Sequence, residues 1–490
     1  MKLFNRDRIN PGVFTSTLPI IFLIVALIGI ILFRGAEAVG YLSPLVLLSA
    51  AVVTMLLSRL TTRRRWRHLW IGLVNSSRQI LPCIPILMSI GAVSATWMLS
   101  GVVPSMICYG LEFLHPALFL MEACVICSLV SVLSGSSWTT IATVGVALMG
   151  IGTVLGYDTG WIAGAIISGA YFGDKVSPLS DTTVLASSTC GVGLFSHIRN
   201  LTYTTVPAFA ITLTVFGIKG ATITTGEYSE SIEVIDQLHS VFNITPWSLV
   251  IPALTVLLLA LRLHTIKTLI ISSLAGLAGI YILQPQLPAT LGMDGSGAWH
   301  HLVTATKMVF TATDFNTGHE MLDSLASTGG VAGMSTTIML VLSGMLFGGM
   351  LLGSGIITTL TRCFQRRLNG RRGIVTATVS SGLLMNSCTA DQFLSIIICG
   401  NLYKGVYRRA GLDSKLLSRS LEDGVSVTSV LIPWNSCGIT QSTVLGVATL
   451  TYLPYCLFNL LSPLCSIGVA YIMHVRSRYK EAGMATIAGK

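Results

Sequence analysis

Charged side chains are scarce in this chain. Asp, Glu, Lys and Arg make up only 10% of its 490 residues, whereas 52% of the residues are hydrophobic. Soluble domains carry about 25% charged residues, so this composition excludes an ordinary water-soluble globular protein. Apolar runs of about 20 residues, long enough to cross a bilayer, recur along the whole sequence. The composition therefore predicts an all-α polytopic membrane protein.

Sequence motifs of soluble enzymes are also missing. The chain has no P-loop, no dinucleotide-binding fingerprint in a strand context and no H-E-x-x-H. Its 11 cysteines are scattered through apolar segments without the spacing of a disulfide framework. We therefore expect neither an enzyme nor a resident cofactor. The net charge of +10 resides in short loops, so it does not indicate a nucleic-acid partner.

The distribution of charge predicts how the chain crosses the membrane. Arginines cluster at residues 59–67 and 362–372, as is typical of cytoplasmic loops. The loops at 221–246 and 285–335 are acidic and are expected on the outer side. This alternation places both the amino and the carboxyl terminus in the cytoplasm, with the chain in a bacterial-type plasma (inner) membrane.

Three segments, 135–156, 387–407 and 413–440, are apolar but rich in Ser, Thr, Gly, Asn and Asp. Irregular backbone is tolerated at membrane depth only where it is buried in protein or lines a watery cavity. These segments therefore predict re-entrant hairpins or broken helices.

The two halves of the chain share a pattern of polar residues. Ser137 and Thr139 are followed by Gly150 and by D-x-V-S-x-x-S from Asp174, with Cys190-Gly191 beyond. The second half has the same order, in the residues Ser387, Thr389, Gly400, Asp423 and Cys437-Gly438. Internal duplication is typical of secondary transporters, in which discontinuous helices from two repeats build the binding site.

The predicted fold is therefore two inverted repeats, each with a re-entrant hairpin and a broken helix, in about 11 to 13 transmembrane segments. We divide the chain into amino-terminal helices (1–60), a first repeat (61–220), outer loops and linking helices (221–335), a second repeat (336–475) and a cytoplasmic tail (476–490).

Both repeats supply the oxygen ligands that a hard cation such as sodium prefers. Asp181, framed by hydroxyls, is our first candidate for a carboxylate that titrates with proton or sodium, and Asp174 is the second, because burial favours the protonated form of a carboxyl group. The other candidate ligands are Ser136, Ser137, Thr139, Ser177, Ser180, Thr182, Asn386, Ser387, Thr389, Asp391, Asn435 and Ser436.

Structural roles are the alternative for several of these residues. Asp174 lies beside Lys175, and Asp423 beside Glu422, so each carboxylate is also compatible with an interfacial ion pair or a helix cap. Ser and Thr inside helices often bond only to the carbonyl four residues earlier.

The stretch G-A-Y-F-G-D-K-V-S-P-L-S-D-T-T-V-L-A-S-S, residues 169–188, resembles the NhaC family of sodium/proton antiporters. Residues 135–145 (G-S-S-W-T-T-I-A-T-V-G), 391–395 (D-Q-F-L-S) and 430–438 (V-L-I-P-W-N-S-C-G) support it. The resemblance implies a secondary active transporter that exchanges sodium for protons by alternating access, with an elevator-like motion.

By the same resemblance, Ser136, Ser137 and Thr139 form one hairpin tip, and Asn386, Ser387 and Thr389 the other. The implied partners are sodium, protons and the lipid bilayer, and a homodimer is compatible with the sequence. Because some family members resemble malate/lactate exchangers, the alternative is sodium- or proton-coupled transport of a small carboxylate or amino acid.

Overall fold

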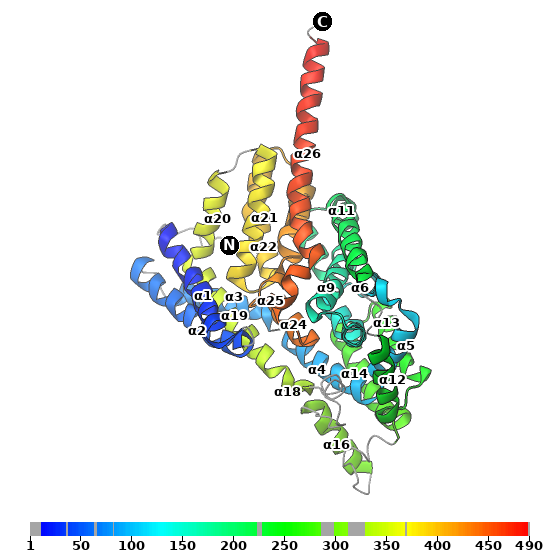
Figure 1. Ribbon diagram of the computed structural model, residues 1–490. Coiled ribbons are helices and arrows are strands. Elements are labelled where there is room, and N and C mark those ends of the chain that lie inside the picture. Colours follow the sequence, from blue (N-terminus) through cyan, green and yellow to red (C-terminus); the bar gives the residue numbers. More distant parts are fainter. Residues whose placement is uncertain are drawn as a thin grey trace.

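The computed structural model describes residues 11–35, 38–62, 66–81, 83–222, 228–285, 298–311, 329–367 and 370–488. Every regular element in these ranges is a helix, as the sequence predicts. Figure 1 shows the helices gathered in one bundle, from which the carboxyl-terminal helix α26 (Leu457–Ala488) projects. The acidic loops predicted on the outer side lie partly outside the described ranges.

Eight helices in the described ranges are long and apolar enough to cross a membrane, or ten if each of two bent helix pairs is one span. The expected number, about 11 to 13, is larger because it includes polar segments such as α9 (Thr159–Val176) and α21 (Gly370–Thr389). These helices carry their polar side chains inside the protein, where other side chains replace lipid as the surroundings.

Two groups of helices lie on either side of the centre of the bundle. Figure 1 shows one group that contains α1 (Val13–Arg34), α2 (Ala38–Leu57), α3 (Trp66–Ile80), α19 (Ser335–Ser354) and α20 (Ile356–Arg367). On the other side are α5 (Val102–Phe113), α12 (Tyr228–Val241), α13 (Val250–Ala260) and α14 (Thr265–Leu283), while α4 (Cys83–Leu99) lies nearer the centre and α16 (Ala298–Phe310) at the bottom of the view. Large apolar side chains such as Phe14 and Ile282 are exposed on these helices, as expected for surfaces that face lipid.

The first helical hairpin reverses at Gly135. Helix α6 (Phe119–Ser134) ends there, and α7 (Ser137–Thr140), η4 (Ile141–Gly145) and α8 (Val146–Val154) return without a gap. Gly135 has φ +67°, a conformation that favours glycine. A Cβ atom at this position would lie 2.6 Å from Leu179 Cβ, in the break between α9 and α10 (Asp181–Cys190). The glycine therefore lets the hairpin tip touch the broken helix.

The second hairpin is built in the same way. Helix α21 ends at Thr389, Ala390 takes a positive φ of 55°, and α22 (Gln392–Arg409) returns. The following broken helix consists of α23 (Ser414–Leu421), η7 (Glu422–Ser426), η8 (Ser429–Leu431) and α24 (Ser436–Leu445). In this unit the tip at Ala390 lies within the predicted segment 387–407, and the breaks of the broken helix lie within the predicted segment 413–440. The re-entrant depth of the hairpins and the inversion of the repeats stay predictions.

The two units are related by a constant spacing of 255 residues. Each helix break in the first unit has a counterpart at this spacing. The hairpin tips are Gly135 and Ala390, and the carboxyl-terminal caps are Gly191 and Gly446. The amino-terminal caps form three pairs, Ser136 with Asp391, Asp158 with Asp413, and Ser180 with Asn435. Tertiary contacts repeat at the same spacing. Ser131 Oγ donates to Ala170 O at 2.6 Å, and Asn386 Nδ2 donates to Val425 O at 2.7 Å.

The register predicted from the sequence is wrong by five or more residues. The sequence pattern pairs Ser137 with Ser387 and Asp174 with Asp423, whereas the spacing of 255 pairs Ser137 with Gln392 and Asp174 with Ser429. Matching residue types misled the alignment because equivalent positions in the two units carry different polar groups. Ser387 lies inside α21, before the tip, and its Oγ bonds back to Leu383 O at 3.2 Å.

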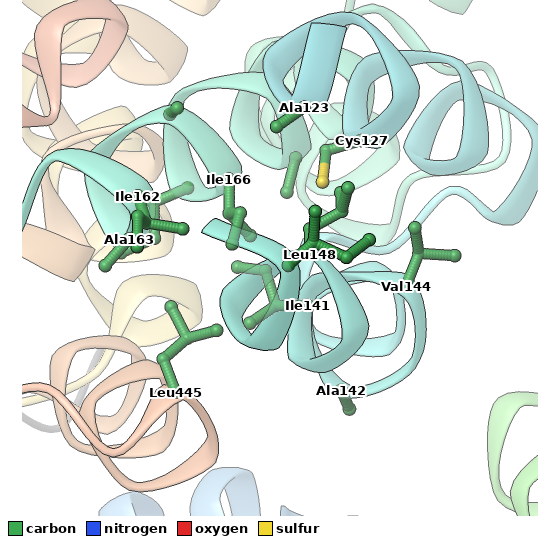
Figure 2. Close-up of a cluster of buried hydrophobic side chains, with 14 of the residues drawn as sticks. Ala123, Cys127, Ile141, Ala142, Val144, Leu148, Ile162, Ala163, Ile166 and Leu445 are labelled. Carbon is green, nitrogen blue, oxygen red and sulfur yellow. The ribbon is translucent and has the colours of Figure 1, made fainter. Parts of the chain in front are cut away.

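Glycines let α6 and α9 pack at close range in the first unit. A Cβ atom on Gly169 would collide with Cys124 O, and one on Gly173 with Ser128 O. Small residues at a spacing of four allow such close helix approach in membrane proteins. Figure 2 shows the adjoining apolar core, to which Ile141 of η4, Ile166 of α9 and Leu445 of the second unit all belong. The core thus holds the two units together beside the helix breaks.

We predict that Gly169→Ala lowers thermal stability while Gly468→Ala does not. Overpacking a tight contact costs about 1 to 3 kcal/mol, whereas alanine in an open helix is preferred over glycine by roughly 0.5 to 1 kcal/mol. A Cβ atom added to Gly468 on α26 would meet no heavy atom within 4 Å, which makes this glycine the matched control. Thermal unfolding of the detergent-solubilised protein measures the difference, and equal midpoints would contradict the packing argument.

Candidate functional site

Asp174 is held directly against the tip of the first hairpin. Its Oδ2 atom accepts hydrogen bonds from Ser137 Oγ at 2.7 Å and from the Ser137 backbone N–H at 3.2 Å. Both residues are buried. Asp174 reaches this position because α9 continues to Val176, so that its last turn lies under the tip. The arrangement joins the two polar motifs of the first repeat, as the sequence predicts.

Further hydroxyl groups lie at the starts of both helices that follow the breaks, α7 and α10. Ser136 Oγ caps α7 and accepts from Thr139 N–H at 3.2 Å, with Thr139 Oγ1 3.1 Å away. Ser180 caps α10, and its Oγ lies 3.0 Å from Thr182 Oγ1. Ser177 Oγ instead donates to Val132 O at 2.7 Å, so this hydroxyl fastens the broken helix to α6.

A cavity of about 300 Å³ lies beside Asp174. It is lined from the first unit by the hairpin tip and the start of α10, and from the second unit by Gln392 and Phe393 at the other hairpin. The turn between α13 and α14 adds Arg262 and His264. The polar lining residues of the first unit are Ser134, Ser136, Asp174, Asp181 and Thr182. The two units therefore meet around one polar space.

The two candidate carboxylates lie in different surroundings. Asp181, the first candidate from the sequence, is exposed at the first residue of α10, where the helix amino terminus stabilises its charge. Asp174 is buried and hydrogen-bonded while still lining the cavity. A buried carboxylate must gain compensation from its ligands, so Asp174 is the stronger candidate for binding a cation.

The second hairpin brings its predicted residues into a separate buried network. Asp391 caps α22, with its Oδ1 2.8 Å from Leu394 N and its Oδ2 3.3 Å from Ser436 Oγ. Asn435 Nδ2 donates to Asn386 O at 3.1 Å. Thr389 Oγ1 is bonded within its own hairpin, to Met385 O and to Asp391 O, at 2.9 Å each. These residues do not line the cavity beside Asp174.

The contact between hairpin tip and broken helix occurs in both units, but the side chains that make it differ. Ser429 Oγ donates to Gln392 Oε1 at 3.2 Å, at the positions equivalent to Asp174 and Ser137. The carboxylate of the first unit is thus replaced by a hydroxyl, and the hydroxyl by an amide. Gln392 and Ser429 were not identified from the sequence, because the signal is the spacing of 255 and not the residue type.

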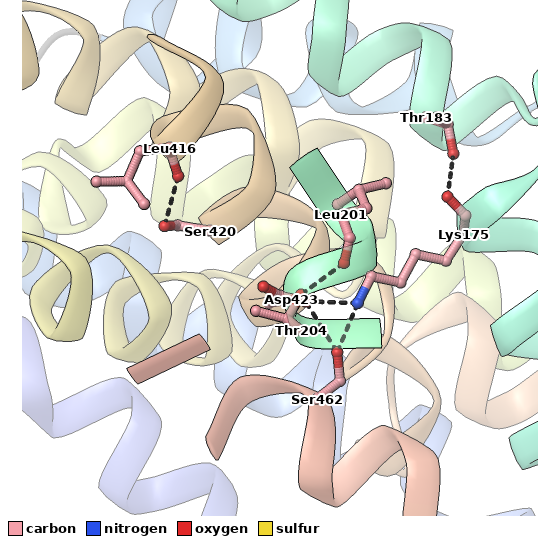
Figure 3. A network of polar contacts seen from close by, with 8 residues as sticks. All are labelled: Lys175, Thr183, Leu201, Thr204, Leu416, Ser420, Asp423 and Ser462. Atoms are coloured by element: carbon pink, nitrogen blue, oxygen red, sulfur yellow. Dashed lines mark hydrogen bonds and ion pairs between the residues drawn. The ribbon is translucent and has the colours of Figure 1, made fainter. Parts of the chain in front are cut away.

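A buried ion pair links the two units next to Asp174. Figure 3 shows Lys175 Nζ against Asp423 Oδ1, at 2.5 Å, with Ser462 Oγ 2.8 Å from the amine. Ser462 Oγ and Thr204 Oγ1 also donate to Asp423 Oδ1, at 2.9 and 3.2 Å. Lys175 is 1% exposed and Asp423 is fully buried. The ion pair considered for Asp423 from the sequence is therefore present and buried, and Lys175 was not identified as its partner.

We predict that Lys175 and Asp423 behave as a unit in stability measurements. Removing one partner of a buried pair costs about 3 to 5 kcal/mol because the other charge stays buried, whereas replacing both can be nearly neutral. Lys175→Gln and Asp423→Asn should each lower the thermal midpoint of the solubilised protein, and the double variant should recover much of the loss.

The exposed Lys267 on α14 provides the control, since Lys267→Gln removes an amine without uncovering a buried partner. A double variant that loses as much stability as both single variants added together would show that the pair is not an energetic unit.

Comparison with known proteins identifies the family of this chain. The model of the Na+/H+ antiporter family matches residues 12–190 and 169–472. A Na(+)/H(+) antiporter NhaC of Alkalihalophilus pseudofirmus is 36% identical over 407 residues, 83% of this chain and 85% of that protein.

Two relatives carry other names. A malate-2H(+)/Na(+)-lactate antiporter of Bacillus subtilis is 33% identical over 445 residues, 89% of this chain and 92% of that protein. An arginine/ornithine antiporter ArcD of Halobacterium salinarum is 32% identical over 434 residues, 88% and 87% of the two chains. The resemblance stated from the motif at residues 169–188 is confirmed, and the chain belongs to the Na+/H+ antiporter family, a family of membrane transporters.

Proposed function

We propose that this protein exchanges sodium for protons across the membrane and that Asp174 binds the sodium ion. The observation that carries the proposal is the position of Asp174, buried at the hairpin tip with Ser137 on its carboxylate and a polar cavity beside it. Relatives named as sodium/proton antiporters support it. Sodium binding would displace one proton from the site, so that the protein never carries the buried negative charge uncompensated.

Oxygen atoms suited to a hard cation lie around Asp174. The hydroxyls of Ser136, Ser137, Ser180 and Thr182 can turn their lone pairs toward a cation, because each hydroxyl has a rotatable proton. Asp181, which the sequence suggested as the titrating group, lines the cavity instead, and we propose that its negative charge attracts cations there. We assign the network of Asn386, Thr389, Asp391, Asn435 and Ser436 to a second cation site in the other unit.

Transport requires the cavity to face each side of the membrane in turn. We propose that the two hairpins and broken helices move as a group against the flanking apolar helices, in an elevator-like motion of inverted repeats. The arginine clusters at 59–67 and 362–372 support a cytoplasmic location of both termini under the positive-inside rule. We infer a bacterial-type inner membrane as the location.

Sodium-driven proton movement in proteoliposomes tests the proposal. With only sodium and inorganic counterions present, the wild-type protein should acidify or alkalinise the lumen according to the direction of the sodium gradient. Asp174→Asn should abolish the signal, because a neutral amide neither balances sodium nor exchanges a proton. Asp181→Asn should retain transport with a weaker apparent sodium affinity, within about tenfold of wild type for one exposed charge.

Transport that survives in Asp174→Asn and disappears in Asp181→Asn would restore the order predicted from the sequence and exclude the site described above.

The hydroxyl of Ser137 provides a second test. Ser137→Ala removes a hydrogen bond to a charged group, worth about 1.5 to 3 kcal/mol, so the apparent sodium affinity should change by about tenfold or more. Ser387→Ala is the matched control, because Ser387 Oγ bonds to Leu383 O within α21. Initial rates over a range of sodium concentrations measure both. Equal effects would favour the register predicted from the sequence.

A small organic anion is the second candidate substrate. The cavity of about 300 Å³ holds more than a bare sodium ion, and Arg262 at its lining could bind a carboxylate. The name of the malate/lactate relative supports this alternative. Proton movement that depends on an added dicarboxylate or amino acid, and is absent with sodium alone, would select it.

A further inference from the structure

One face of helix α4 lines two separate cavities. This face, which we call the cavity face, consists of residues that recur every three or four positions, as one side of a helix requires: Cys83, Ile86, Ile90, Ser94 and Met98. Cys83 and Ile86 line the cavity beside Asp174. Ile90, Ser94 and Met98 line a second cavity, of about 250 Å³, which the site described so far does not use.

The returning helix of the first hairpin runs between the same two cavities. Trp138 of α7 lines the cavity beside Asp174, whereas Val146 and Gly150 of α8 line the second one. Between these residues, η4 is packed against α4. The end of α24 and the start of α18 (Gly330–Gly333) also line the second cavity. The hairpin and α4 therefore extend together from one cavity to the other.

The cavity beside Asp174 lies on the cytoplasmic side in the orientation proposed above. It is lined by the turn between α13 and α14, in which Arg262 and His264 are exposed. Helices α13 and α14 connect this turn to the acidic segments 221–246 and 285–335, so the turn lies across the membrane from both. We call this cavity the cytoplasmic cavity.

The second cavity lies on the outer side. The end of α4 is tied to the acidic segments, because Gln284 Nε2 donates to Ser100 O at 3.4 Å and to Asn243 O at 2.9 Å. Gly329, near the end of the segment 285–335, is exposed and lines this cavity. The described residues around it include no ionisable side chain, so this outer cavity offers a cation a passage without a charged ligand.

The barrier between the two cavities is short. Ile86 and Ile90 are four residues apart, which is about 6 Å along an α-helix. Leu87 within this turn is fully buried, and Ile90 is 1% exposed. On the hairpin the barrier contains η4, a π-helical segment, and such segments within α-helices are frequent at functional sites. Because switching proteins shift elements by one helical turn, a displacement of this size is sufficient to carry the hairpin tip past the barrier.

Helix α4 is anchored away from the hairpin. Trp97 Nε1 donates to Ser272 Oγ of α14 at 2.9 Å. A Cβ atom on Gly276 of α14 would lie 2.8 Å from Thr96 Cβ, so the two helices are in close contact. This packing keeps α4 with α14 while the hairpin moves.

We propose that sodium crosses the membrane along the cavity face of α4, and that the turn from Ile86 to Ile90, packed against η4, is the barrier between its two exits. The inference rests on the proposed sodium site at Asp174. The described structure is the state in which this site is open to the cytoplasm. In the other state the hairpin tip has moved along α4 and the site opens into the outer cavity.

Thiol labelling from each side of the membrane tests this path. Ile86→Cys places a thiol in the cytoplasmic cavity and Ser94→Cys places one in the outer cavity. Ser89→Cys is the matched control, because Ser89 lies in an apolar groove against α14 and its Oγ bonds to Pro85 O at 2.8 Å. The probe is a methanethiosulfonate reagent with a trimethylammonium group, which does not cross membranes. It is applied to right-side-out and to inverted vesicles, and peptide mass spectrometry locates the label among the native cysteines.

Ile86→Cys should be labelled from the cytoplasmic side alone and Ser94→Cys from the outer side alone. The attached cation should abolish exchange of radioactive sodium in both variants, because it obstructs the path. Ser89→Cys should stay unlabelled and exchange sodium as the wild type does. Ile90→Ala thins the barrier, so in combination with Ser94→Cys it should admit the reagent from the cytoplasmic side as well.

Labelling of either single variant from the opposite side, or from neither side, would overturn the assignment of the two exits. Undiminished sodium exchange after complete labelling would show that sodium does not pass along this face of α4. Unchanged one-sided labelling with Ile90→Ala would exclude this turn as the barrier. A wild-type protein that exchanges no sodium would instead overturn the site at Asp174, a separate result, since labelling does not depend on that site.

Discussion

The compensation of buried charge is the constraint on which this structure depends. A charged side chain at the centre of a membrane helix costs about 2.5 to 3.5 kcal/mol even on the mildest scale. Asp174 is compensated by Ser137 of the opposing tip, and Lys175 and Asp423 compensate each other across the two units. Each solution requires groups from different helices, so the charges can be buried only when the hairpins and broken helices are assembled.

Helix breaks make this assembly possible. A continuous helix keeps its backbone groups bonded to one another, whereas a break leaves N–H groups free at the start of the next segment. The Ser137 N–H uses that freedom to bond to Asp174, and Ser136 and Asp391 cap the two returning helices. Polar residues at the tips thus serve the backbone and the site together, which explains their density in otherwise apolar segments.

Much of this architecture could be predicted from the sequence, and the failures have a common cause. The helical class and the two hairpin tips follow from local composition. The register between the units does not, because Gln392 and Ser429 reproduce the contact of Ser137 and Asp174 with different side chains. The partnership of Lys175 with Asp423 depends on helix packing, which no local pattern contains.

The ion pair between Lys175 and Asp423 is a difference between the two units. Val430 and Ser168 occupy the positions equivalent to Lys175 and Asp423, so the pair has no counterpart at the related place in the bundle. Under the alternating access proposed above, the two facing orientations would therefore differ in energy before any gradient acts on the molecule, because the buried contact of Lys175 with Asp423 has no counterpart in the other unit.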